Sequence, residues 1–140
     1  MLTMKFTYEV EGNEFIDAGV ASSKFKTTLK QLGLPTNLIR KIAIAMYEAE
    51  INMVIHANGG EIVAEVTPTN IYVRLEDHGP GIPDIDLAMQ AGYSTASEQA
   101  RTMGFGAGMG LPNIKRYSDH LKVHSEVNVG TIVEISFDIQ

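Results

Sequence analysis

The chain has 140 residues, of which 44% are hydrophobic and 20% charged, and its formal net charge is −6. This composition is typical of a single globular domain, here residues 1–140. The absence of cysteine excludes a disulfide framework, a thiolate metal site and a cysteine nucleophile. The acidic balance argues against a general nucleic-acid-binding protein.

The distribution of hydrophobic residues predicts neither a membrane span nor a secretion signal. The aliphatic run 42–55 is interrupted by Glu48, Glu50 and Asn52, so we do not expect it to cross a membrane. The first ten residues lack the apolar stretch of a signal peptide. The sequence therefore predicts a cytoplasmic protein.

Taken in chain order, the periodicity predicts eight elements. Met4, Phe6, Tyr8 and Val10 alternate with polar residues, which indicates a strand. Helices are expected over 16–33 and from about 35 to 57, followed by strands at 61–67 and 70–76. After a glycine-rich stretch at 77–110 come a short helix at 112–119 and a hairpin of strands 121–127 and 131–138. This order predicts an α+β fold, a two-layer α/β sandwich with a mixed, mostly antiparallel sheet covered on one face by helices.

The second predicted helix carries a polar stripe. Glu48, Asn52 and His56 are spaced four residues apart, so they lie on one face of the helix. Such a stripe offers a hard oxygen ligand for Mg²⁺ at Asn52 and a carboxylate at Glu48 that can hold or deprotonate a nucleophile. The alternative is a plain solvated face, with Tyr47 and Glu50 as ordinary surface residues elsewhere on the helix.

A second cluster follows directly after a predicted strand. Asp77 ends that strand, and Gly79 and Gly81 come next, allowing backbone turns and close approach of a ligand to the main chain. A fixed carboxylate beside such a turn can accept a hydrogen bond from an exocyclic amine such as that of adenine. The alternative is an ordinary turn built from Gly, Pro and Asp.

The third cluster is a run of alternating glycines that leads into a helix. Its glycines are Gly104, Gly106, Gly108 and Gly110. Successive free N–H groups beside a helix N-terminus form a concavity that binds anions and fits a polyphosphate. The run is neither a Walker loop nor a GxGxxG motif, and the alternative is a flexible loop.

Together, the three clusters resemble the N, G1 and G2 boxes of the Bergerat-type ATP-binding fold of the GHKL superfamily, which includes DNA gyrase, Hsp90-type chaperones, histidine kinases and MutL. The resemblance covers about residues 35–137 and is strongest to the small stand-alone anti-sigma factor serine/threonine kinases. Further shared segments are Tyr47 to Asn52, Asp77 to Asp84, Gly92 to Thr95, and Gly130-Thr131.

The resemblance implies a role for each matching residue. Asn52 would ligate the Mg²⁺ that bridges the phosphates of ATP, and Glu48 would be the general base. Asp77 would bind the adenine amino group, with Thr131 assisting through water. Residues 86–103 would form a lid over ATP. The other implied ATP-binding residues are His56, Gly79, Gly81, Arg101, Gly104, Gly106, Gly108, Gly110 and Leu111.

Three functions remain open at this point. The first is an ATP-dependent protein serine/threonine kinase that phosphorylates an anti-sigma factor antagonist and so holds or frees a sigma factor. The resemblance also implies a homodimer, with no direct nucleic-acid or membrane partner. The second is a nucleotide-sensing binding module without phosphotransfer. The third is a detached histidine-kinase-like ATPase domain, although no dimerisation helix pair with a phosphoacceptor histidine is evident.

Overall fold

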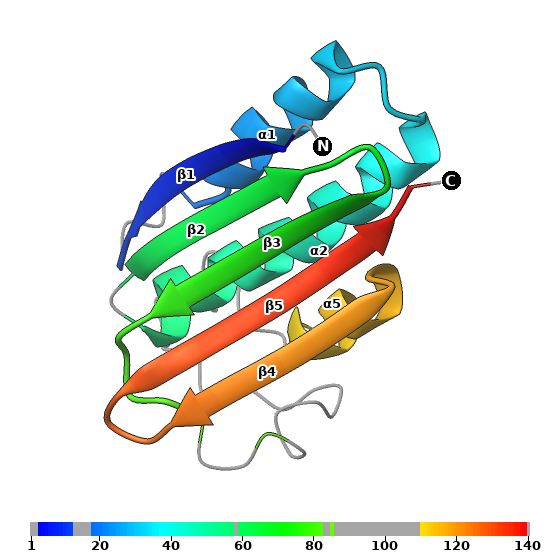
Figure 1. Cartoon of the computed structure of the whole chain (residues 1–140). Coiled ribbons are helices and arrows are strands. Elements are labelled where there is room, and N and C mark those ends of the chain that lie inside the picture. The colour runs from blue at the N-terminus through cyan, green and yellow to red at the C-terminus, as the bar shows by residue number, and fades with distance from the viewer. Residues whose placement is uncertain (1–2, 13–17, 58, 83–84, 86–109, 140) are drawn as a thin grey trace.

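The computed structural model describes residues 3–12, 18–57, 59–82, 85 and 110–139. These residues form one five-stranded sheet with three helices packed on one of its faces (Figure 1). The elements are β1 (Met4–Glu11), α1 (Val20–Gln31), α2 (Thr36–His56), β2 (Gly59–Val66), β3 (Asn70–Asp77), α5 (Gly110–Tyr117), β4 (His120–Glu126) and β5 (Gly130–Asp138). The predicted α+β two-layer sandwich is confirmed.

The strand order is β1-β2-β3-β5-β4, and all four pairings are antiparallel. The sequence predicted a mixed, mostly antiparallel sheet, because hairpins join most strands and helices are grouped between them. β3 and β4 do run in the same direction, but β5 lies between them and is antiparallel to both. The described strands therefore contain no parallel pair.

The core lies between the sheet and the helices. On each central strand every second residue faces the helices and is buried, as the period of a strand requires; these residues include Ile62, Ile71, Val73, Leu75, Ile135 and Phe137. Phe25 and Leu29 of α1 and Ile42 and Met46 of α2 pack onto this surface and are fully buried. Burying each such side chain stabilises the fold by roughly 1.5–3 kcal/mol.

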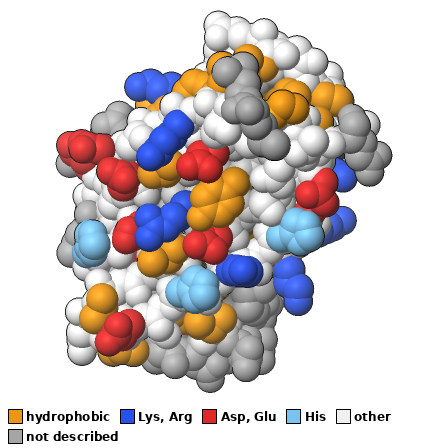
Figure 2. Space-filling model, viewed as in Figure 1, with side chains coloured by type: hydrophobic (Ala, Val, Ile, Leu, Met, Phe, Trp, Pro, Cys, Tyr) orange, Lys and Arg blue, Asp and Glu red, His pale blue; other side chains and the backbone are white. Residues whose placement is uncertain are grey.

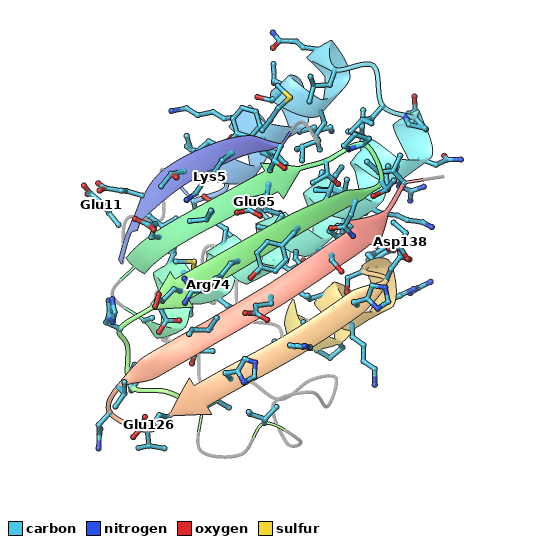
Figure 3. The ribbon with its side chains drawn as sticks, in the orientation of Figure 1. Lys5, Glu11, Glu65, Arg74, Glu126 and Asp138 are labelled. Carbon is cyan, nitrogen blue, oxygen red and sulfur yellow. The ribbon has the colours of Figure 1, made fainter. Side chains whose placement is uncertain are left out.

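The other face of the sheet is open and polar. Figure 2 views this face and shows cationic, anionic and histidine side chains interspersed over it. Lys5, Glu65, Arg74 and Asp138 all project from its strands (Figure 3), and Arg74 Nη2 lies 3.2 Å from a carboxylate oxygen of Glu76. The alternation of buried and exposed residues along the strands therefore follows from one covered face and one open face.

The start of α1 is fixed by a residue of α2. Glu50 is only 2% exposed, and its carboxylate accepts hydrogen bonds from the backbone N–H groups of Gly19 (3.0 Å), Ala21 (3.2 Å) and Ser22 (2.8 Å) and from the Ser22 hydroxyl (2.6 Å). These are the donors that a helix N-terminus leaves unpaired. Reading Glu50 as an ordinary surface residue is therefore wrong, and α1 begins at Val20 rather than at residue 16.

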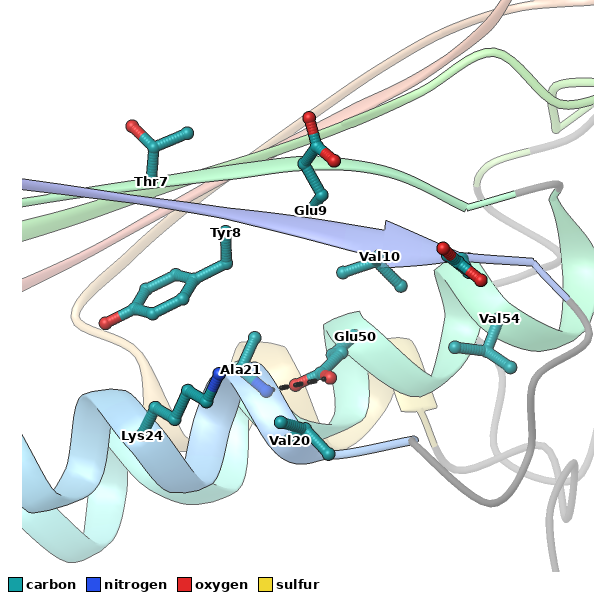
Figure 4. A pocket seen from close by; sticks show the side chains of 10 residues that line it. Thr7, Tyr8, Glu9, Val10, Val20, Ala21, Lys24, Glu50 and Val54 are labelled. Atoms are coloured by element: carbon teal, nitrogen blue, oxygen red, sulfur yellow. Dashed lines mark hydrogen bonds between the residues drawn. The ribbon is translucent and has the colours of Figure 1, made fainter.

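A cavity of about 380 Å³ lies beside this contact, between β1, α1 and α2. Tyr8, Val10, Val20, Lys24 and Val54 help to line it, and the bond from Ala21 to Glu50 crosses one wall (Figure 4). Glu50 points from α2 towards α1, whereas Glu48 interacts with α5. The cavity is thus separate from the polar stripe on α2. No described helix combines the length and apolar character that crossing a membrane requires.

Candidate nucleotide-binding and catalytic site

The polar stripe of α2 faces α5. Glu48 and Asn52 are both half-buried, and the side chain of Asn113, in the first turns of α5, hydrogen-bonds to the Glu48 carboxylate. Burial raises the pKa of Glu48 above its ordinary value of 4.5, and the hydrogen bond from Asn113 opposes this effect. His56 is the last residue of the helix, but its side chain lies outside the described residues.

Asp77 is held rigidly at the end of β3. Its Oδ1 accepts hydrogen bonds from the backbone N–H of Gly79 at 2.9 Å and of Thr131 at 3.1 Å. Among the described residues, neither of the hydrogen bonds found at this carboxylate uses Oδ2. One oxygen therefore fixes the orientation of the carboxylate, and the other can accept a hydrogen bond from a ligand.

Gly79 and Gly81 are required by packing within the protein. A Cβ at Gly79 would lie 2.5 Å from the Cβ of Ala57, the residue that follows α2. Gly81 has φ +81° and a Cβ there would lie 2.5 Å from the carbonyl oxygen of Glu126, so a side chain is excluded both by conformation and by space. The sequence suggested that these glycines let a ligand approach, whereas in the structure they let the turn after Asp77 contact the end of α2 and the β4–β5 turn.

That turn is also tied to the neighbouring strands by hydrogen bonds. The N–H of Asn128 donates to the carbonyl of Pro80 at 2.7 Å. The N–H of Ile82 donates to the hydroxyl of Ser125 at 2.6 Å, and this hydroxyl lies 2.8 Å from Oγ1 of Thr131. Thr131 is 7% exposed and contacts Asp77 through its backbone N–H, whereas its predicted assistance through water stays a prediction. No motif marked Ser125, which is a lone serine in an alternating strand.

The third cluster is described only where it enters α5. Gly110 is the first residue of α5, two residues earlier than predicted, and Leu111 is buried in the core. The helix thus begins directly at the last glycine of the run. Arg101, Gly104, Gly106, Gly108 and the predicted lid over 86–103 lie outside the described residues.

In the structure β3 and α2 end at the same end of the sheet, and α5 lies along the same helix-covered face (Figure 1). The contact between Gly79 and Ala57 places the Asp77 turn against the end of the helix that carries Glu48 and Asn52. Asn113 links the same helix to the element that follows the glycine run. Asp77, Asn52 and the half-buried Glu48 are thus supplied by adjoining elements.

Comparison with known proteins agrees with this arrangement. The sequence profile of histidine kinase-, DNA gyrase B- and HSP90-like ATPases matches residues 37–140. The chain belongs to this ATPase family. The match begins near the start of α2 and includes every predicted site residue. The resemblance inferred from the three motifs is therefore confirmed at the level of the family.

The similarity to individual relatives covers most of the chain. The serine/threonine-protein kinase RsbT of Bacillus subtilis is 33% identical over 113 residues, which cover 78% of this chain and 79% of the relative. The anti-sigma F factor of Caldanaerobacter subterraneus subsp. tengcongensis is 30% identical, covering 97% and 92% of the two chains. A mycobacterial sensor histidine kinase, MprB, shares the fold with a TM-score of 0.56 at 14% identity, covering 98% of this chain and 99% of its own.

Proposed function

We propose that this ATPase-family chain is a protein serine/threonine kinase of the anti-sigma factor type, which transfers the γ-phosphate of Mg-ATP to a serine of an antagonist protein. The observation that carries the proposal is the half-buried Glu48 carboxylate, one helical turn before Asn52 and oriented by Asn113. A protein that only sensed nucleotide would need the purine and phosphate contacts, but it would have no use for a positioned base.

The donor set on α2 fits magnesium in its usual mode of binding. Among the described residues no group of three or more His, Cys, Asp or Glu side chains could hold a metal ion. Mg²⁺ commonly takes one or two protein ligands and completes its shell with phosphate oxygens and water. Asn52 would be the protein ligand, and the bound ion would neutralise charge on the phosphates.

The roles of the chain's own residues follow from the needs of phosphoryl transfer, which depends chiefly on positioning and charge neutralisation. Asp77 holds the adenine amino group through Oδ2, which accepts none of the hydrogen bonds found at this carboxylate among the described residues. Glu48 accepts the proton of the serine hydroxyl as that oxygen attacks the γ-phosphorus and ADP leaves. Because burial raises the pKa of Glu48, the carboxylate is a stronger base than a solvated glutamate.

The remaining assignments belong to the same proposal and rest on the family resemblance. The amides of Gly104, Gly106, Gly108 and Gly110 would bind the phosphates, with Arg101 and His56 nearby. The protein partner would be an antagonist that switches a sigma factor between free and bound states, and the kinase would act as a homodimer. Since ATP and such transcription regulators are cytoplasmic, the proposed activity belongs to the cytoplasm.

Phosphotransfer from ATP with a radiolabelled γ-phosphate to candidate antagonist proteins tests the proposal. We expect acid-stable phosphoserine on the partner, and we expect Glu48→Gln to abolish the label while ATP still binds in calorimetry. Glu134→Gln, on the open face of the sheet, is the matched control and should transfer phosphate normally. Full transfer by Glu48→Gln would refute the role of the base. ATP binding without transfer to any partner would favour the sensing module, and base-stable phosphohistidine would favour the histidine-kinase-like alternative.

A further inference from the structure

Three side chains form a row across neighbouring strands at the end of the sheet where β3 ends. Asp77 ends β3, Thr131 lies near the start of β5, and Ser125 lies near the end of β4. Thr131 and Ser125 are paired in the register of the two strands. All three project to the helix-covered side of the sheet, where their polar atoms are joined by short contacts.

Ser125 uses the full hydrogen-bonding capacity of its hydroxyl. The Oγ accepts from the N–H of Ile82 at 2.6 Å, lies 2.8 Å from Oγ1 of Thr131, and can donate to the carbonyl of Gly130 at 3.3 Å. A serine hydroxyl offers one donor and two acceptor positions, so these three contacts occupy it. Ser125 therefore holds the hydroxyl of Thr131, the residue whose backbone N–H donates to Oδ1 of Asp77.

We propose that Ser125 is a positioning residue for purine recognition, which orients Thr131 and fixes the turn after Asp77 so that the site selects adenine over guanine. The inference rests on the proposed binding of ATP. Asp77 can accept a hydrogen bond from the amino group at C6 of adenine, whereas guanine presents a carbonyl oxygen there, and two acceptors repel each other. Discrimination of this kind depends on polar groups that cannot turn to suit the wrong base.

A purely structural role for Ser125 predicts a different outcome. A hydroxyl that only stabilised the turn would, when removed, lower the affinities for ATP and GTP by the same factor. Ser125 contacts the hydroxyl of Thr131 and the backbone N–H of Ile82, in the turn that follows the carboxylate proposed to bind the base. We therefore expect its loss to weaken adenine nucleotides selectively.

Calorimetry of ATP and GTP binding in the presence of magnesium tests the inference. Ser125→Ala should weaken ATP by about three- to tenfold, the effect of one neutral hydrogen bond, with the ATP-to-GTP selectivity falling by the same factor. Ser125→Thr, which keeps the hydroxyl, should restore most of the selectivity. Ser136→Ala, on the open face of β5, is the matched control and should change neither affinity.

A double-mutant cycle tests the route through Thr131. In a Thr131→Val background Ser125→Ala should cause little additional loss, because the hydroxyl that it orients is gone. If Ser125→Ala does not fold, Ser125→Cys fills nearly the same space without a strong hydroxyl and serves for the same comparison. Unchanged selectivity for ATP over GTP in a folded Ser125 variant, or additive losses in the cycle, would overturn this inference and leave the proposed function intact. Failure of the natural chain to bind ATP would instead overturn the proposed function on which it rests.

Discussion

The hydrogen bonds at Glu50 allow one stability prediction to be developed in detail. Replacing Glu50 by alanine removes the acceptor for three backbone N–H groups and one hydroxyl at the start of α1. The amides of Ala21 and Ser22 are buried, whereas Gly19 is partly exposed and Ser22 can rotate its hydroxyl. Two buried amides therefore lose their partner without a replacement.

The expected magnitude follows from that count. Each buried donor left unsatisfied costs about 1–3 kcal/mol, so the loss of two partners in Glu50→Ala should destabilise the fold by about 2–6 kcal/mol. This range includes the cost of about 3–5 kcal/mol for breaking a buried charged contact. Glu50→Gln keeps one acceptor oxygen, which can serve Ser22, and turns an amino group towards Ala21. With one buried amide unpaired, the glutamine variant should lose about 2 kcal/mol.

Urea denaturation followed by circular dichroism measures this effect. Domains of this kind have a free energy of unfolding of about 5–15 kcal/mol, so the glutamine variant should remain folded and show a lower midpoint with an unchanged slope. Glu134→Gln on the open face is the control and should stay within about 0.5 kcal/mol of the natural chain. If both Glu50 variants also stayed within that margin, the carboxylate would not be the cap that fixes α1.

Four further predictions concern the site itself. Asp77→Asn keeps an oxygen for its two backbone donors but turns an amino group towards adenine, so ATP affinity measured by calorimetry should fall about 10- to 100-fold; unchanged affinity would remove Asp77 from the site. Asn52→Ala should abolish the tightening of ATP binding by magnesium in a titration with and without the metal, and normal tightening would show that the metal assignment is wrong. Because burial raises the pKa of Glu48 above 4.5, ionisation of this carboxyl destabilises the folded state, and the penalty grows as the pH rises from 4.5 through the folded pKa. Glu48→Gln should therefore be more stable than the natural chain at neutral pH, and this gain should vanish below pH 4.5. Asn113→Ala removes the hydrogen bond that lowers the pKa of Glu48, so the acid limb of the pH profile of kinase activity should move to higher pH. An unshifted limb would show that Asn113 does not influence the ionisation of Glu48.

Features encoded by short-range periodicity could be predicted from the sequence. The alternation in β1 and β3 and the helical spacing in α2 gave elements close to those observed, because each pattern reports which face of one element is buried. The motif from Asp77 to Gly81 and the stripe through Glu48 and Asn52 are likewise local, and they were sufficient to indicate the ATPase family. The absence of a parallel pair among the described strands could not be predicted, because it depends on the position of β5 between β3 and β4.

Tertiary structure alone decided the features that depend on contacts between distant segments. The cap of α1 comes from Glu50, which is 28 residues beyond Ser22 in the chain, so no local signal marked either the start of α1 or the burial of Glu50. Ser125 meets Ile82 across 43 residues, and the need for glycine at position 79 arises from Ala57 of another element. A sequence records which groups are available for such contacts, whereas the partners that satisfy them are set only when the sheet and helices pack.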